Sequence, residues 1–270
     1  MLATPIYWVN DPSQKPNNSR KLACLLVAFL FFASGSICMS AEPDPATAAR
    51  RQYWTAQAWH AKEPTNSTLA WEFARACYDA AEYATNNGER SEIAQQGITT
   101  CVQLLARQPD SAPGHYYFGM NLGQLARTKG LAALKTAQEM KQEFAIARDL
   151  DEQFDYAGPD RNLGMFYRDA PAWIGLGSRT RAIEHLKHAT ELAPEYPENR
   201  LALIEAYLKW NDRNGARREL KGLEQVWTNA HATLAGPTWA SSWPEWDERF
   251  KNLKKKIEGP SKALETPHEQ

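Results

Sequence analysis

The sequence predicts an all-α fold, a solenoid of about four lengthened helix pairs with a capping helix at each end. Between residues 46 and 257, Ala, Leu, Glu, Lys, Arg and Gln predominate, and the alternating runs of Val, Ile and Thr that indicate strands are missing. Gly and Pro occur in clusters, and each cluster predicts a joint between helices. The joints are expected at residues 86–88, 109–114, 158–159, 171–177, 194–197, 214–215 and 236–237.

The first forty residues have the composition of an export signal. Arg20 and Lys21 precede an apolar run of 17 residues that ends at Cys38, and Cys38-Met39-Ser40 before Ala41 fits the small-residue pattern of a signal-peptidase site. We expect residues 1–40 to be a signal peptide that is cleaved close to Ala41. Because a run of this length lies at the lower edge of a membrane span, a retained N-terminal membrane anchor is the alternative. Both alternatives place the helical domain in the periplasm or envelope of a bacterium.

Capping helices are expected at both ends of the helical domain, residues 46–257. Residues 46–62 should form the first, with Tyr53, Trp54 and Ala58 facing inward. Residues 239–257 should form the second, because their apolar residues recur every three or four positions. These residues are Trp239, Trp243, Trp246, Phe250, Leu253 and Ile257. The tail at 258–270 contains two prolines and is expected to be disordered.

Four internal repeats are expected between the caps, at about 66–109, 112–152, 158–194 and 197–228. Small residues in each repeat allow its two helices to approach closely, while larger apolar residues fill the seam to the next pair. The last repeat has the clearest series: Leu203, Tyr207, Ala216, Leu220 and Leu223. The corresponding series are Leu163, Gly164, Tyr167, Ala182, Leu186, Ala189 and Pro194; Phe118, Gly119, Leu122, Met140, Phe144 and Ala147; and Trp71, Ala74, Tyr78, Gly97, Cys101, Leu104 and Pro109.

This order of apolar and small residues resembles the tetratricopeptide repeat (TPR), although three of the four repeats are longer than the usual length of about 34 residues. The resemblance implies a right-handed α-solenoid whose concave groove is lined by the first helix of each pair. It also implies a non-enzymatic role in binding a protein or peptide partner.

A narrower resemblance covers residues 109–224. The stretches YFGMNLGQLARTKGLAALKTAQEM, ARDLDEQFDYAGPDRNLGMFYRDAPAW and GSRTRAIEHLKHATELAPEYPENRLALIEAYL look like the T-component of TPR-associated tripartite ATP-independent periplasmic (TRAP) transporters. This resemblance implies an exported accessory protein that associates with a periplasmic solute-binding protein.

The register of the family, carried over from Gly119, Gly164 and Ile204, places nine residues on the groove. They are Tyr116, Met120, Gln124, Arg161, Met165, Arg168, Leu201, Glu205 and Lys209. On this register, Arg161 and Arg168 would hold a carboxylate-bearing segment of the partner through their guanidinium forks. The alternative is that these two arginines only pair with Asp160 and Asp169 on the surface of the repeat.

Cys77 and Cys101 are the two cysteines that remain if the signal is removed. They lie equally far from Glu89, which follows the turn at residues 86–88, so an antiparallel helix pair places them at the same height. In an oxidising compartment they could form a disulfide, and the alternative is two buried thiols. The sequence leaves both alternatives open.

Motifs for catalysis, for nucleotide binding and for zinc are missing from the sequence: it has no HExxH, GxSxG, Walker loop or CxxC. His185 and His188 lie three residues apart, but no third metal ligand is near them in the sequence, and a solvated helix face is the preferred interpretation. With 31 basic and 32 acidic residues, the chain lacks the positive charge that nucleic acid would require. We therefore expect no catalytic residues, no metal, no cofactor and no nucleic-acid partner.

The sequence thus predicts an exported protein-binding solenoid, with a TRAP T-component as its most specific interpretation. Two alternatives remain: a general TPR scaffold for envelope or secretion complexes, and an enzyme whose site lies in the lengthened loops. The sequence leaves the oligomeric state open, with a homo-oligomer among the options.

Overall fold

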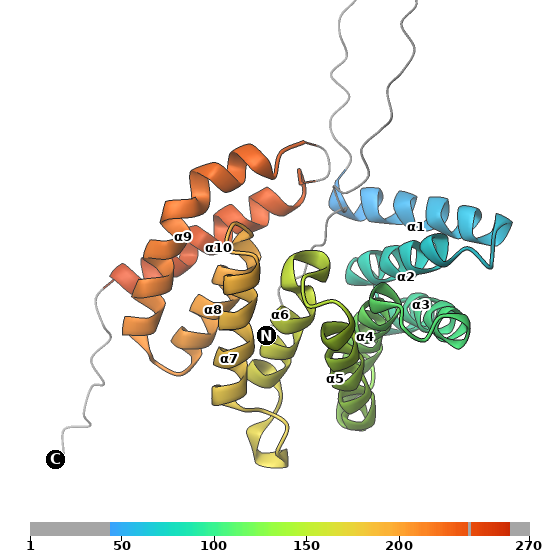
Figure 1. Ribbon diagram of the computed structural model, residues 1–270, viewed down its shortest axis with the longest axis horizontal. Coiled ribbons are helices and arrows are strands. Elements are labelled where there is room, and N and C mark those ends of the chain that lie inside the picture. Colours follow the sequence, from blue (N-terminus) through green and yellow to red (C-terminus); the bar gives the residue numbers. More distant parts are fainter. Residues whose placement is uncertain (1–43, 237–238, 260–270) are drawn as a thin grey trace, which may run out of the picture.

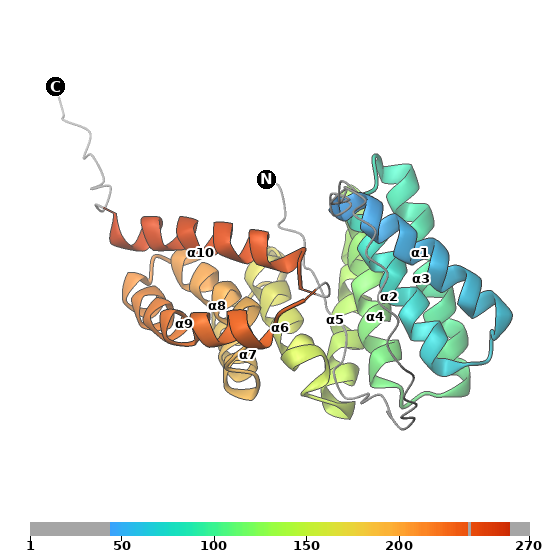
Figure 2. The ribbon, with the colours of Figure 1, turned by 90° about the horizontal axis from the view of Figure 1, so that it is seen from above.

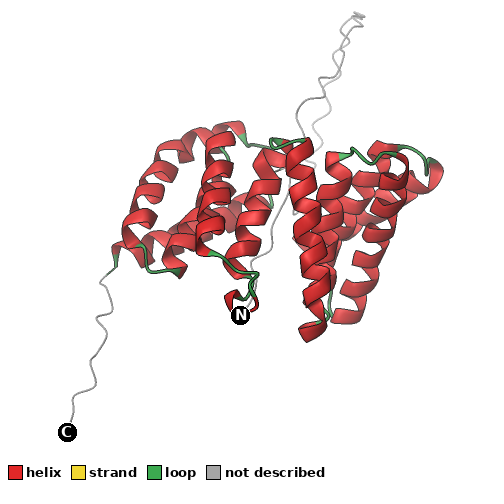
Figure 3. Ribbon diagram, turned by 60° about the horizontal axis from the view of Figure 1, so that its bottom comes forward, coloured by secondary structure: helices red, strands yellow, loops and turns green. Residues whose placement is uncertain are grey.

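The computed structural model describes residues 44–236 and 239–259, except for the side chain of Leu131. Within these ranges every regular element is a helix (Figures 1 and 3). The elements are α1 (Pro45–Lys62), α2 (Ser67–Glu82), α3 (Asn87–Arg107), α4 (Ala112–Arg127), η1 (Gly130–Ala132), α5 (Ala133–Leu150), α6 (Phe154–Asp169), η2 (Ala172–Ile174), α7 (Arg179–Leu192), α8 (Pro197–Lys209), α9 (Arg213–Thr233) and α10 (Ser242–Glu258).

The predicted all-α solenoid is confirmed. Helices α2 to α9 form four consecutive pairs, and α1 and α10 flank them. The first helix of each pair also contacts the first helix of the next pair, so α2, α4, α6 and α8 form a continuous inner row. The expected signal at residues 1–40 and the tail from residue 260 lie outside the described residues. None of the described helices is both long enough and apolar enough to cross a membrane.

Polar residues at the joints start the helices by capping free backbone amides. The Asn66 side chain accepts hydrogen bonds from the Thr68 and Leu69 amides at the start of α2, at 3.0 and 3.3 Å. Asn86 accepts from the Glu89 amide at 2.9 Å at the start of α3. Ser111, Ser178 and Asp212 cap α4, α7 and α9 in the same way.

Small residues bring the two helices of each pair together, as the repeat pattern predicts. A Cβ atom added at Gly119 would lie 2.7 Å from the Phe144 ring, and one added at Gly164 would lie 2.5 Å from Leu186 Cγ. The larger apolar residues of the pattern are buried along the seams; Leu163 and Leu203, for example, are at most 2% exposed. The core of the solenoid therefore follows the TPR positions.

The extra length of the repeats appears in two forms. In the first pair the second helix, α3, has 21 residues. In the third pair the extra residues form the connection at 170–178, which contains η2 and ends at the N-cap residue Ser178. This connection projects beyond the ends of α6 and α7, as the yellow loop at the lower edge of Figure 1.

The N-terminal capping helix differs from the prediction. Tyr53 is buried, and its hydroxyl donates a hydrogen bond to Gln96 Oε1 at 2.8 Å. Trp54 is 60% exposed and Ala58 is also exposed, while Ala49 is buried. The reason is that α1 packs mainly against α2 through one narrow face. Residues that follow one another in a helix point about 100° apart, so Tyr53 and Trp54 cannot both face that partner.

The C-terminal capping helix covers the last pair as predicted. Helix α10 lies across α8 and α9 (Figure 2). Helix α10 begins three residues later than predicted, so Trp239 lies in the turn before it, and of the six apolar residues predicted for this cap four are buried and two are partly buried. The buried four are Trp239, Trp246, Leu253 and Ile257, and the partly buried two are Trp243 and Phe250.

We predict opposite effects for alanine at two helical glycines. Gly164→Ala should lower the free energy of unfolding by about 1–3 kcal/mol, because the new methyl group must displace Leu186 in the seam between α6 and α7. Gly222→Ala is the matched control: its nearest neighbour is the flexible end of Arg200, so the better helix propensity should leave stability unchanged or raise it by up to about 1 kcal/mol. Urea unfolding of both variants measures the difference, and equal effects would contradict this packing.

Candidate interaction surface of the inner helices

The nine predicted groove residues divide into two groups by burial. Five are at most 3% exposed and lie inside the inner row instead of on its open surface: Tyr116, Met120, Gln124, Arg161 and Leu201. Met165, Arg168 and Glu205 are half-buried, and Lys209 is exposed. This corrects the open groove that the register implied. The physical reason is that neighbouring inner helices pack directly on one another, so positions between the core positions are also covered.

Arg161 holds an unusual turn at the start of α6. Residues Asp155, Tyr156 and Ala157 all have left-handed backbone, with φ of 53°, 56° and 60°. This conformation costs about 1–2 kcal/mol for each residue that has a Cβ atom. The Arg161 guanidinium donates to the carbonyl oxygens of Tyr156 and Asp155, at 3.0 and 3.1 Å. These bonds offset part of the cost, because the turn itself cannot satisfy those carbonyl groups.

The same turn connects three helices of the inner row. The Asp155 carboxylate accepts from Tyr116 Oη of α4 at 2.8 Å and pairs with Arg161 at 3.3 Å. Arg161 also donates to Asn199 Oδ1 of α8 at 2.7 Å, and Asn199 in turn donates to the Tyr156 carbonyl at 3.1 Å. Burial raises the pKa of Asp155 to about 7, against the opposing effects of Arg161 and the Tyr116 hydrogen bond.

Two aromatic clusters meet at residues 154–156. Phe154 lies in the first, edge-on to both Tyr117 and Trp71, which stack on each other with ring centres 5.9 Å apart. Tyr156 lies in the second and stacks on Tyr196 with ring centres 4.6 Å apart. The left-handed turn between them directs two residues that are close in sequence into different clusters. Trp71, Phe154 and Tyr156 are half-buried and leave part of their rings accessible.

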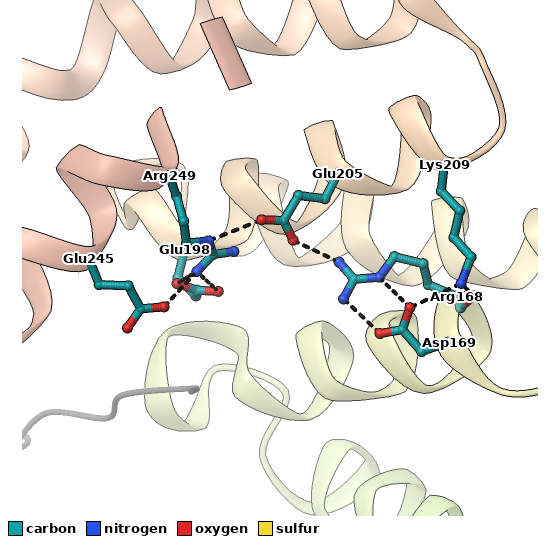
Figure 4. A network of polar contacts seen from close by, with 7 residues as sticks. All are labelled: Arg168, Asp169, Glu198, Glu205, Lys209, Glu245 and Arg249. Carbon is teal, nitrogen blue, oxygen red and sulfur yellow. Dashed lines mark hydrogen bonds and ion pairs between the residues drawn. The ribbon is translucent and has the colours of Figure 1, made fainter. Parts of the chain in front are cut away.

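A network of ion pairs joins α6, α8 and α10 (Figure 4). Arg168 binds both carboxylate oxygens of Asp169, at 3.0 and 2.7 Å, and donates to Glu205 at 3.0 Å. The other oxygen of Glu205 accepts from Arg249 Nε at 3.0 Å. Lys209 also contacts Asp169, at 3.1 Å. Arg168 therefore pairs with Asp169, which is the alternative to partner binding given in the sequence analysis. The N–H groups of its guanidinium already have carboxylate partners within the protein.

The buried end of this network contains three ionisable groups whose pKa values depend on one another. Arg249 Nη1 lies 2.8 and 2.6 Å from the two oxygens of Glu198. Burial alone would raise the pKa of Glu198, but Arg249 overrides it and holds this pKa below its usual range. Burial and the negative charge of Glu198 raise the pKa of Glu245 to about 8. Glu245 is therefore mostly protonated at neutral pH.

The sequence analysis also allowed an ion pair between Arg161 and Asp160. The structure does not contain it. Asp160 is 1% exposed and accepts from two histidines of α7: His185 Nδ1 at 2.6 Å and His188 Nδ1 at 2.8 Å. Burial alone would raise the pKa of Asp160, but these two hydrogen bonds hold it below its usual range. An open hollow of about 890 Å³ lies beside these residues, between the end of α5 and α7. No group of three potential metal ligands occurs among the described residues.

Cys77 and Cys101 are both buried free thiols in the structure. Burial raises the pKa of each thiol, and the nearby Cys77 raises that of Cys101 further. Both groups are therefore protonated at neutral pH, the form that reacts poorly.

Sequence reasoning missed most of the groups that shape this surface. Asp155, Asn199 and Arg249 lie outside the repeat pattern, and their contacts join residues 38 to 51 positions apart. The nearest local signal is Gly158-Pro159, which the sequence predicts as a joint between helices and which the structure places within α6, directly after the left-handed turn.

The inner row of helices, the close contacts at glycine and the buried pattern residues define a TPR-like helical-repeat protein. Comparison with known proteins supports this class. The structure is similar to the crystal structure of a thermophilic TPR protein of Thermus thermophilus, with a TM-score of 0.54 and 18% sequence identity. The match covers 78% of this chain and 97% of that chain. At this identity the likeness shows the fold alone.

Residues 46–157, from α1 to the left-handed turn, match a family profile described as Regulator of microtubule dynamics protein 1-3. The match covers less than half of the chain. No curated protein sequence matches the chain at a significant level.

We predict that Arg161→Ala destabilises the fold by about 3–5 kcal/mol, because it leaves buried carbonyl groups and the Asp155 carboxylate without their donor. Arg148→Ala is the control, since Arg148 pairs with Asp149 at the surface, and its effect should stay within about 0.5 kcal/mol. Chemical unfolding measures both variants. A stable Arg161→Ala protein would contradict the role of Arg161 in holding the turn.

We also predict that Glu245 makes stability depend on pH. Its pKa is about 8 in the folded protein against an ordinary value of 4.5, so between these values the folded state binds more protons than the unfolded state. The Glu245 contribution to the free energy of unfolding must therefore fall as pH rises from about 5 to about 8. Glu245→Gln should remove this slope, which unfolding experiments at several pH values measure. Glu248→Gln, on the exposed side of α10, is the control, and parallel curves for wild type and Glu245→Gln would contradict the prediction.

Proposed function

We propose that the chain is a non-enzymatic scaffold that binds a protein or peptide partner on its inner helices. The observation that carries this proposal is the fixed set of half-exposed side chains on α6 and α8. Met165 supplies apolar surface there, while Arg168, Glu205 and Lys209 are held by the ion-pair network. A surface that is already ordered loses little conformational entropy on binding, so it binds at low cost.

We further propose that the protein is exported and serves as the T-component of a TRAP-type uptake system. The support is the sequence: the resemblance over residues 109–224 and the signal-like segment at residues 1–40. The partner would then be a periplasmic solute-binding protein. A general scaffold for envelope or secretion complexes is the second candidate, and the TPR-like fold suits it equally.

The non-enzymatic part of the proposal is supported by the roles of Asp155 and Glu245, the acids whose pKa values are raised to about 7 and about 8. Perturbed acids are often catalytic. Here Asp155 is bound to Tyr116 and Arg161, and Glu245 lies 3.4 Å from Arg249. Asp155 therefore takes part in contacts that hold helices together, and Glu245 supports Arg249, which joins α10 to Glu198 of α8.

Site-specific photo-crosslinking in the producing cell tests the proposal. A photoreactive amino acid at position 165 should form an adduct with one polypeptide, and the same amino acid at the exposed position 187 of the outer helix α7 should not. If the protein is a TRAP T-component, mass spectrometry should identify the crosslinked polypeptide as a periplasmic solute-binding protein. Any other single partner would favour the general scaffold.

With that partner in hand, Met165→Glu combined with Lys209→Glu should weaken binding at least about tenfold, or about 1.4 kcal/mol. Lys187→Glu should leave binding unchanged. The melting temperature of the double variant should stay close to that of wild type, because neither side chain is fully buried. Equal crosslinking at positions 165 and 187, or unchanged affinity in the double variant, would contradict the inner-surface assignment.

A further inference from the structure

Charges are sorted between the two ends of the helix pairs. The first helices of the pairs run in the same direction, so the connections within pairs gather at one end and the connections between pairs at the other. The connections at 127–136, 169–181 and 209–218 contain nine basic and two acidic residues. Those at 148–155 and 191–198 contain seven acidic residues and one basic residue. Although the chain has a formal net charge of -1, the two ends of the last three helix pairs therefore differ strongly in charge.

The three basic connections lie side by side. Ala137 and Met140 from the first half of α5 pack in the same apolar cluster as Ile174 and Trp210. Arg179 lies 3.6 Å from Asp212, and Lys209 lies 3.1 Å from Asp169, so ion pairs also join the connections. We call this surface, residues 127–136, 169–181 and 209–218, the basic end.

Much of the positive charge of the basic end is not neutralised. Within the described residues, five of its exposed cations form no ion pair: Lys129, Lys135, Arg181, Arg217 and Arg218. Lys129 donates only to the Thr136 hydroxyl, and Arg181 lies over the Tyr167 ring. The two acids of this surface, Asp169 and Asp212, are already paired with Arg168 and Arg179.

A tryptophan projects from the middle of the basic end. Trp173 is 86% exposed, more than any other large apolar side chain described. Its loop is well ordered by hydrogen bonds: the Gly175 amide donates to the Ala172 carbonyl at 2.9 Å, and the Ser178 amide donates to the Tyr167 carbonyl at 2.9 Å. Leu176, three residues along, is buried in the apolar cluster with Phe166 and Tyr167 and so anchors the loop. The loop therefore presents the indole to solvent at a fixed position.

We propose that the basic end docks on the surface of a membrane that contains anionic phospholipid, with Trp173 inserted at headgroup level. Indole rings favour the boundary between lipid headgroups and acyl chains, and exposed Lys and Arg are attracted to anionic headgroups. The five cations come from three separate connections around one projecting ring. A bilayer supplies continuous negative charge to such a spread-out set, whereas a protein partner would need acids at several matching places. Leu134, 42% exposed in the first turn of α5, adds apolar surface to the same connections.

Quenching of tryptophan fluorescence by brominated phospholipid tests this proposal on the full chain. Vesicles would contain brominated phosphatidylcholine, with or without phosphatidylglycerol. In the presence of phosphatidylglycerol, wild type should be quenched more than Trp173→Ala, because the ring at position 173 lies in the bilayer interface. Trp59→Ala is the matched control, since Trp59 is 58% exposed on α1, outside the basic end, and its removal should not reduce the quenching.

The charge requirement is tested by Lys135→Glu combined with Arg181→Glu, which keeps Trp173. This variant should lose the phosphatidylglycerol-dependent quenching and keep the melting temperature of wild type, because both side chains are exposed. High salt should weaken the wild-type signal through screening. Equal quenching of wild type and Trp173→Ala would overturn the proposal, as would quenching that is independent of phosphatidylglycerol. A Trp173→Ala variant that loses a protein partner and keeps the full lipid signal would assign the surface to a protein instead.

Discussion

The buried guanidinium of Arg161 is the interaction on which the middle of this solenoid depends. Three consecutive residues with left-handed backbone precede α6, and they leave carbonyl groups that no helix can satisfy. Arg161 binds two of these carbonyls and also joins Asp155 to Asn199. Helices α4, α6 and α8 therefore share one set of buried polar contacts, and the position of each inner helix depends on the others.

The strained turn also determines the character of the inner surface. It directs Phe154 and Tyr156 into two different aromatic clusters, one toward α2 and α4 and the other toward α8. The ion pairs from Arg168 to Arg249 then continue the cross-links to α10. These contacts fix the side chains of the inner face in place, which suits the scaffold role proposed above.

The alternating direction of the helices separates basic from acidic connections, although the formal net charge of the chain is only -1. Consecutive antiparallel helices send alternate connections to opposite ends, so a modest bias in loop composition becomes a separation of charge over the last three helix pairs. In the connection between α6 and α7, the extra residues of the third repeat form a projecting loop that carries Trp173 instead of a longer helix. Two surfaces of different chemistry result, one along the inner helices and one at the basic end.

Local sequence patterns were enough to specify the helices and their pairing. Apolar residues three and four apart define a buried face, and small residues such as Gly164 mark where two helices touch, so Leu203 and Tyr207 were correctly expected in the core. Both signals are local, and a single sequence displays them directly. The periodicity of apolar residues shows on which face of its helix a side chain lies, but not which neighbouring helix covers that face.

The depth of each inner side chain, in contrast, depends on how the helices pack together. Arg161 and Tyr116 were expected in an open groove and are covered by neighbouring inner helices, while Trp54 was expected inside and is exposed because α1 has one narrow contact face. The pairing of Asp160 with His185 and His188 likewise joins residues 25 and 28 positions apart. Such contacts depend on the distances and angles between packed helices. These are set by the volumes of all the side chains at an interface together, so no local spacing in the sequence contains them.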